Sequence, residues 1–318
     1  MEVIGIDISK STFDAWAPST GHKSFKNNEK GFTGLLEWAG IEGHFVMEST
    51  CSYHMQLATF LYESCCKVSV VNPLPVKRFM QMRLQRLKTD KSDARMLGLY
   101  GEAEKPRLWQ PEAGFIQECK LIMSTIELYL RQQTALKNKL DNLESGGLEK
   151  GKLISSLKLQ VKRIKSEIKK LEEIVQEMIK EHAGAEMAQL TSIPGIGKKT
   201  AAMLLAYSNL YKDFDNYRQF IAYVGLCPVH RQSGTSVKGR SYISKKGNKM
   251  LRNHLFLCSF TACLYNPQCK ALYDRLVSKG KSKKLALIAV SNKLIRQSFG
   301  VVKNGLPYDP EYKSLLTA

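Results

Sequence analysis

Acidic side chains stand at the ends of two apolar, strand-like segments near the N-terminus. Asp7 follows "VIGI" and Glu48 follows "HFVM". A carboxylate that closes a buried strand costs free energy unless it is paired, hydrogen-bonded or bound to a metal. A lone aspartate at the end of a strand is more often a satisfied turn residue. If the two strands are neighbours, however, both carboxylates meet at one edge of the sheet.

A second pair of acidic residues, Asp90 and Asp93, lies in "KTDKSDAR" (88–95). A spacing of three puts both on one face of a helix that begins there. A solvated surface turn would also read this way. Four carboxylates around one point repel one another unless divalent cations lie between them. Ligand sets made only of oxygen favour Mg²⁺ or Mn²⁺, and such ions promote transfer at a phosphodiester. The set therefore predicts a metal-dependent phosphoryl-transfer site.

Strand and helix signals alternate over the first 75 residues, which must position these acidic side chains. The pattern predicts a mixed β-sheet with helices packed on it. The strand-like segments are 3–9, 12–18, 23–27, 44–49 and 67–73, and the helix-like segments are 30–39 and 52–65.

Residues 112–181 carry a different pattern, in which apolar residues alternate spacings of four and three. The pattern runs from Phe115 to Leu143 and, after the Gly-rich break "ESGGLEKG" (144–151), from Leu157 to Met178. Such a heptad seam in each arm predicts an antiparallel helical hairpin. Because the seam is narrow and flanked by charges, we expect a dimerising coiled coil. An arm packed on its own chain is the alternative.

Composition favours a polyanionic partner. The chain has 318 residues and a formal net charge of +19, and residues 187–318 carry most of the excess. A charge of this size usually indicates nucleic acid binding. The eight cysteines form no CxxC pair, which argues against zinc. No apolar run reaches the ~18 residues of a membrane span. We expect a cytoplasmic protein with reduced thiols and no signal peptide.

Two basic segments in the C-terminal region could grip phosphates. In "SIPGIGKKTA" (192–201), Gly195 and Gly197 allow a tight turn, and a following helix N-terminus could offer N–H groups to a phosphate beside Lys198 and Lys199. A plain turn between helices is the alternative. The second segment, residues 227–253, reads as a basic loop. Its candidate phosphate contacts are Arg231, Lys238, Arg240, Lys245 and Lys246.

Several of these segments resemble a known family. "GIDISKSTFD", "MEST" and "KTDKSDARML" are similar to the signatures of the DEDD-type insertion-sequence transposases, which include the Piv and MooV DNA invertases. The resemblance implies a RuvC-like, ribonuclease-H-type domain. It also implies that Asp7, Glu48, Asp90 and Asp93 form an acidic tetrad that holds Mg²⁺. "SIPGIGKKTA" resembles a helix–hairpin–helix element, which would contact DNA independently of its sequence.

The resemblance also implies a serine nucleophile in the C-terminal transposase domain. The matching position in "RQSGTSVKG" is Ser233. From the residues alone, Ser236, Ser241 or Ser244 would serve nearly as well. His230 lies close in sequence, but a lone loop histidine is more often incidental.

The expected architecture is α/β plus all-α. We expect a RuvC-like mixed-sheet catalytic domain (1–111), a coiled-coil hairpin that serves as spacer and dimerisation element (112–186), and a basic, mostly helical transposase domain (187–318). The expected function is that of a bacterial insertion-sequence transposase acting at the nucleoid. It would use Mg²⁺ and a phosphoserine intermediate to cleave and rejoin donor and target DNA.

The resemblance further implies guidance by a structured bridge RNA, and we expect a dimer or a dimer of dimers. Three other functions stay open. A Piv-type site-specific invertase would read its own DNA sites. A RuvC-like structure-specific nuclease would need the tetrad but not Ser233. A nucleic-acid-binding scaffold would need neither.

Overall fold

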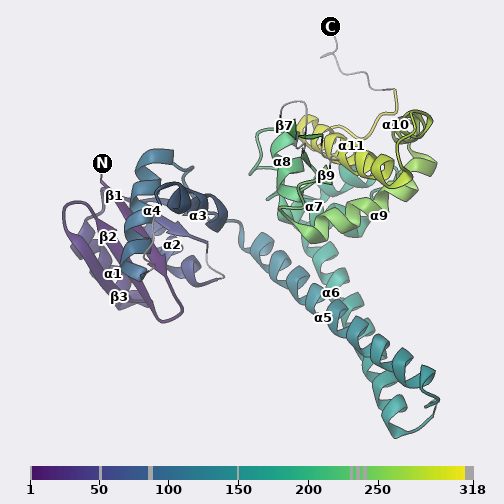
Figure 1. The fold of residues 1–318 in the computed structure, drawn as a ribbon, viewed down its shortest axis with the longest axis horizontal. Helices are drawn as coiled ribbons and strands as arrows, with labels where there is room; N and C mark the ends of the chain where they lie inside the picture. The colour runs from purple at the N-terminus through teal and green to yellow at the C-terminus, as the bar shows by residue number, and fades with distance from the viewer. Residues whose placement is uncertain are drawn as a thin grey trace. The chain divides into compact units, whose positions relative to one another are not determined.

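The computed structural model describes residues 2–49, 52–84, 89–148, 150–229, 232–233, 237–238 and 242–311, with the backbone alone at 232–233 and 237–238. Its contacts divide the chain into two compact units, Met1–Pro111 and Glu112–Ala318 (Figure 1).

The first unit contains a mixed five-stranded sheet, as predicted. Its strand order is β3-β2-β1-β4-β5. The pairs β3–β2 and β2–β1 are antiparallel, while β1–β4 and β4–β5 are parallel. The strands are β1 (Val3–Ile8), β2 (Thr12–Ala17), β3 (Gly21–Lys26), β4 (His44–Glu48) and β5 (Lys67–Val71). The helices of this unit are α1 (Glu29–Ala39), α2 (Tyr53–Glu63), α3 (Pro73–Met82) and α4 (Asp90–Glu104).

The two faces of the sheet are covered differently. One face presents large apolar side chains, among them Ile4, Ile6 and Phe45, to a core that includes Leu35 of α1 and Leu57 of α2. The alternate residues of the same strands face α4. On this side lies a smaller cluster of five buried residues, Val3, Val46, Val71, Val76 and Leu97.

Helix α4 approaches β1 unusually closely because glycines meet at the contact. A Cβ atom added to Gly5 would lie 2.0 Å from the Ala94 carbonyl oxygen and 2.2 Å from the Gly98 nitrogen. A Cβ at Gly98 would lie 2.9 Å from the Trp16 ring. Farther along α4, a Cβ at Gly101 would meet the Val3 and Val46 side chains. The helix therefore runs antiparallel to β1, and its first turn lies toward the end of β1 that carries Asp7.

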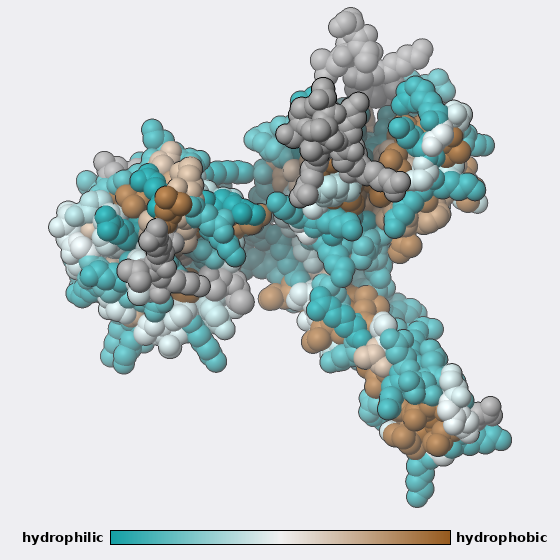
Figure 2. Space-filling model, in the orientation of Figure 1, coloured by the Kyte–Doolittle hydropathy of each residue, from teal (hydrophilic) through white to brown (hydrophobic). Residues whose placement is uncertain are grey.

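The second unit begins with a long helical hairpin. Its arms are α5 (Gly114–Ser145) and α6 (Lys152–Thr191). Seam residues such as Ile126, Leu140, Ile168 and Val175 are buried, so the narrow apolar stripe packs arm against arm within one chain. The outer surface of the hairpin mixes hydrophilic side chains with apolar patches (Figure 2), and Leu121, Leu153 and Leu159 are exposed there. Dimerisation through this hairpin stays a prediction.

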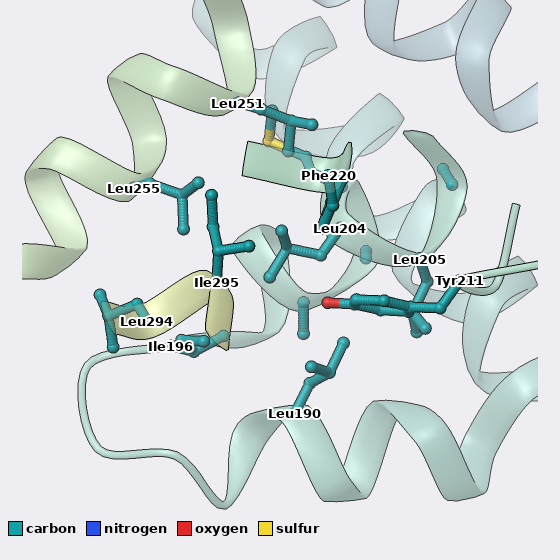
Figure 3. Packing of buried hydrophobic residues seen from close by; sticks show 14 of the residues in the cluster. Leu190, Ile196, Leu204, Leu205, Tyr211, Phe220, Leu251, Leu255, Leu294 and Ile295 are labelled. Carbon is teal, nitrogen blue, oxygen red and sulfur yellow. The ribbon is translucent and has the colours of Figure 1, made fainter. Parts of the chain in front are cut away.

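The base of the hairpin belongs to the same core as the helices that follow it. That core includes Cys119 of α5 and Leu190 of α6, together with side chains of the C-terminal helices (Figure 3). The position expected to separate spacer from transposase domain, 186/187, falls inside α6, which continues past a kink at Ala183. The remaining helices are α7 (Lys198–Tyr207), α8 (Tyr217–Val224), α9 (Lys249–Tyr265), α10 (Pro267–Ser278) and α11 (Lys283–Asn304).

Helix α11 is long and apolar enough to cross a membrane by length and composition. Its side chains Val290, Leu294 and Ile295 are fully buried in the core of the second unit. Its apolar character is therefore explained by packing inside the protein.

The segment expected to be a basic loop contains short strand pairs. They are β6 (Pro228–Val229) with β9 (Tyr242–Ile243), and β7 (Gln232–Ser233) with β8 (Val237–Lys238). Two-residue strands leave little signal in a sequence this polar, which explains the difference.

Replacing Gly5 with Ala should destabilise the first unit by roughly 3 kcal/mol or more, because the new methyl group overlaps the α4 backbone. Gly34→Ala is the matched control, since its Cβ would make ordinary 3.7 Å contacts with the Phe25 ring. All three tryptophans lie in this unit, so urea unfolding followed by Trp fluorescence reports on it alone. Equal stability of the two variants would contradict the close α4 contact.

Candidate active site

Asp7 and Glu48 project from neighbouring strands onto the face that α4 covers. The parallel register pairs Ile6 with Met47, so Asp7 and Glu48 occupy the next positions along the two strands. Side chains alternate across a strand. Asp7 therefore shares its face with Gly5, and Glu48 shares its face with Val46. Both carboxylates are half-buried.

The motif "KTDKSDAR" supplies the first turn of α4 and a complete capping box. The Thr89 hydroxyl accepts a hydrogen bond from the Ser92 N–H at 3.2 Å, and the Ser92 hydroxyl oxygen accepts one from the Thr89 N–H at 3.0 Å. These reciprocal bonds satisfy helix-end donors that would otherwise be unpaired. They give Thr89 and Ser92 a structural role beside Asp90 and Asp93, which occupy the same turn.

The pKa of Asp7 reflects both its burial and the acidic residues close to it. Burial raises the pKa of Asp7 from 3.8 to about 6, and the charges of Asp93, Asp90, Glu48 and Asp14 add to the increase in that order. A carboxylate surrounded by like charges holds its proton more tightly. The first turn of α4 and the ends of β1 and β4 thus build one acidic surface.

These side chains do not form a closed metal cage as they stand. Within the described ranges, no three His, Cys, Asp or Glu side chains are grouped closely enough to hold a metal ion. The donors fit a hard cation nonetheless, since they are all carboxylate oxygens. Their mutual repulsion at Asp7 is also the interaction that a bound cation would relieve.

A fifth carboxylate, Asp14, belongs to the same surface and was missed in the sequence. Asp14 is the direct cross-strand partner of Asp7. Its Oδ1 lies 2.7 Å from Nε2 of His22 on β3. The alternation of "TFDAWA", with Phe13 and Ala15 buried on the other face, could have revealed its direction.

A cation also lies over this face of the sheet. The Arg95 guanidinium carbon is 5.9 Å from the centre of the Trp16 ring, and the Arg95 side chain is exposed. Arg95 follows Asp93 by two residues on α4, so a positive group borders the acidic surface. Such a group suits a phosphate that enters between them.

The Gly-rich turn of the second unit precedes α7, as expected. The two lysines that follow it, Lys198 and Lys199, differ from each other in their surroundings. Gly195 has φ +107, and a Cβ atom added to it would lie 2.7 Å from the Ala262 Cβ atom of α9. Gly197 is the N-cap of α7, without a side-chain cap. Lys198 is exposed. Lys199 instead pairs with Glu172 of α6, so its charge is partly neutralised within the protein.

The basic serine region is described only in part. Ser233 lies in β7, where its backbone pairs with Val237. Its side chain and that of Lys238 are outside the described residues, as are His230, Arg231, Ser236, Arg240 and Ser241. Lys245 and Lys246 are exposed on a turn held to α8, where the Asn248 N–H donates to the Tyr223 carbonyl oxygen at 2.8 Å. The half-buried Ser244 lies in the same turn, where its N–H donates to the Cys227 carbonyl oxygen.

Two family models match this chain. A transposase model of the IS110 DEDD type covers residues 4–143, which include the acidic surface. The model described as the IS116/IS110/IS902 family of transposases covers residues 187–274, which include Ser233. Together they span well over half of the chain.

Similar proteins come from several bacteria. The pilin gene-inverting protein of Moraxella lacunata is 31% identical over 96% of this chain and 97% of its own length. Its counterpart in Moraxella bovis is also 31% identical, with the same coverage. The transposase of insertion sequence element IS1111A from Coxiella burnetii is 22% identical over 92% of this chain and 87% of its own length.

Asp7→Asn should stabilise the first unit at high pH in the presence of a chelator. The pKa rise from 3.8 to about 6 corresponds to roughly 3 kcal/mol of cost for the ionised form. Because the folded pKa is the higher one, this cost is full above pH 6 and disappears as the pH falls toward 4. Urea unfolding followed by Trp fluorescence at pH 8, 6 and 4 measures it. A stability difference that is independent of pH would contradict the acidic surface.

Proposed function

Because the chain belongs to the IS116/IS110/IS902 family of transposases, we propose that this DNA recombinase cuts and rejoins strands through a covalent link to Ser233. The carboxylates Asp7, Glu48, Asp90 and Asp93 would hold Mg²⁺, with Mn²⁺ as a substitute. The observation that carries the proposal is the acidic surface, on which burial, followed by the charges of the other three residues, raises the pKa of Asp7.

The residues of the first unit prepare the acidic surface for a phosphodiester. The capping box holds Asp90 and Asp93 in the first turn of α4, and the glycine contact fixes that turn beside β1. A bound Mg²⁺ would neutralise these carboxylates and the developing charge on the phosphate oxygens. Arg95 borders the surface and would contact a phosphate there.

The proposed cleavage transfers a phosphoryl group from a DNA strand oxygen to Ser233. The Ser233 Oγ atom attacks the phosphorus, so that a new P–O bond forms while the bond between phosphorus and one strand oxygen breaks. The hydroxyl proton of Ser233 ends on the released strand oxygen, and no water is consumed. The reverse step with a different strand end rejoins DNA, because the covalent link conserves the phosphodiester bond energy.

Positive side chains would stabilise the phosphate near Ser233. Arg231, Lys238, Arg240, Lys245 and Lys246 all lie within thirteen residues of it in the sequence. Cationic groups aimed at developing negative charge lower the barrier most when they are fixed in advance. The helix–hairpin–helix-like turn, with Gly195, Gly197 and Lys198, would add a contact to the DNA backbone. Lys199 would contribute less, since Glu172 already pairs with it.

The charge of +19 suits RNA as well as DNA. We propose guidance by a structured bridge RNA that pairs with donor and target DNA in the bacterial cytoplasm. We also propose a dimer or a dimer of dimers, in which the acidic surface and Ser233 can come from different subunits.

One alternative has a specific observation in its favour. The relatives at 31% identity that span nearly the whole chain are named for inverting a pilin gene. A Piv-type site-specific invertase would use the same residues without a guide RNA. A RuvC-like nuclease would use the acidic surface alone, and a scaffold would use neither.

Adding Mg²⁺ should stabilise the first unit of the wild type by roughly 1.4 kcal/mol at ten times its Kd. Asp93→Asn should lose most of this gain, because Asp93 is the largest charge contribution at Asp7. Glu37→Gln is the matched control, since it removes one exposed carboxylate from α1. Trp-monitored unfolding with and without Mg²⁺ makes the comparison. The same gain in all three proteins would mean that the acidic surface holds no ion.

Ser233→Ala should abolish strand exchange between donor and target DNA by at least ~10³-fold, as expected for loss of a nucleophile. It should also remove the covalent DNA–protein adduct seen on a denaturing gel. Ser244→Ala serves as the control. Exchange retained in Ser233→Ala would exclude the serine mechanism, and cleavage retained without rejoining would favour the nuclease.

The same exchange assay separates RNA guidance from direct DNA reading. Protein treated with ribonuclease should lose exchange and regain it when the co-purified RNA is added back. Exchange that survives the treatment would favour the invertase.

A further inference from the structure

A pocket of about 340 Å³ lies in the second unit, apart from the acidic surface. Helices α8, α10 and α11 and the segment 306–309 surround it. Its size falls at the lower end of the range for pockets that hold small ligands, which is ~300–1,000 Å³. It therefore has room for a group the size of one nucleotide.

Two cationic side chains of α11 line this pocket. Arg296 places its guanidinium carbon 4.8 Å from the centre of the Tyr217 ring of α8. Lys293, one turn earlier, is half-buried. Burial, followed by the charge of Arg296, lowers the pKa of Lys293. Two like charges held together in a partly buried site favour an anionic ligand.

A hydrogen-bond network fixes part of the wall of this pocket. The Asn266 side chain donates to Gln297 Oε1 at 3.1 Å, and Gln297 donates to Gln268 Oε1 at 3.2 Å. The Tyr308 hydroxyl donates to Asn266 Oδ1 at 3.0 Å, and the Tyr308 N–H donates to the Ser192 hydroxyl at 2.7 Å. Because Asn266 and Gln297 are buried, this wall is formed before any ligand binds.

The pocket is also kept open by a glycine inside a helix. Gly300 lies in α11 and lines the pocket, and a Cβ atom built on it would meet no atom within 4 Å. A helical glycine costs about 1 kcal/mol relative to alanine. No close contact in the described structure requires that glycine. Its effect is to leave room in the pocket next to the apolar side chains of Val301 and Leu306.

The rim offers groups that can bind the edge of a base. The exposed residues Asn304 and Asp309 line the pocket, and the Asp309 carboxylate accepts a hydrogen bond from the Glu311 N–H at 2.8 Å. Amide and carboxylate groups are typical partners of base amino groups. Cations on one wall and base-edge partners on the rim match the two ends of a nucleotide.

We propose that this pocket binds one unpaired nucleotide of a single-stranded nucleic acid. The phosphate lies against Lys293 and Arg296, and the base enters the space beside Gly300, against Tyr308 and Leu306. A base paired within a duplex cannot enter, because it stays stacked between its neighbours. The pocket thereby gives the protein a contact for unpaired strands that is separate from the cleavage chemistry. The inference rests on the proposed function only in that the partner is a nucleic acid.

The test is binding of a fluorescein-labelled eight-nucleotide strand, measured by fluorescence anisotropy at about 150 mM salt. Gly300→Leu fills the pocket without losing helix propensity, and Arg296→Gln removes one charge from it. Each should weaken single-strand binding by about tenfold, as expected for the loss of one stacked base or one phosphate contact. Lys303→Gln is the matched control, because it removes a charge from the same helix and does not line the pocket.

Three further comparisons make the result specific. A duplex of the same sequence should bind Gly300→Leu as tightly as wild type. Ribose and deoxyribose strands distinguish an RNA from a DNA ligand, and a loss with either one supports the pocket. Wild-type affinity in Gly300→Leu, or equal losses in Arg296→Gln and Lys303→Gln, would overturn the proposal. Ser233→Ala should bind the strand normally, so failure of the serine mechanism leaves this result intact.

Discussion

The close contact between Gly5 of β1 and the backbone of α4 sets the geometry on which the acidic surface depends. Only hydrogen side chains allow the helix to lie this near the strand, where an added Cβ would overlap main-chain atoms at 2.0 Å. Because α4 runs antiparallel to β1, the contact brings the first turn of the helix to the end of the strand. Asp90 and Asp93 thereby reach Asp7 and Glu48, although 42 residues separate Glu48 from Asp90 in the sequence.

Repulsion among these carboxylates is tolerated because the surrounding packing fixes their positions. The capping box holds one pair, and two neighbouring strands of the sheet hold the other. Burial of Asp7, followed by this repulsion, raises its pKa to about 6. Functional sites often hold like charges close together, because their residues are arranged to bind a ligand and not to maximise stability. A bound cation would neutralise the carboxylates, and a phosphate could then bind beside it.

We propose that the second unit contacts a polyanion in two different ways. Basic residues around Ser233 and at the α7 turn would bind any phosphate backbone through their positive charge. The pocket between α8, α10 and α11 has a fixed wall and a limited volume, so it would select a ligand by shape. The hairpin packs its apolar seam arm against arm and joins the same core at its base.

The sequence by itself determined the mixed sheet, the two long helical arms and the four acidic positions, because strand alternation and heptad spacing are local patterns. It also pointed to the family to which the chain belongs. Tertiary structure decided what local patterns do not encode. It added Asp14 and His22 to the acidic surface through cross-strand pairing, and it paired Lys199 with Glu172, 27 residues away. It also assembled the pocket by placing Tyr217 of α8 beside α10, α11 and the segment 306–309. These features depend on long-range packing, which no spacing within one segment can specify.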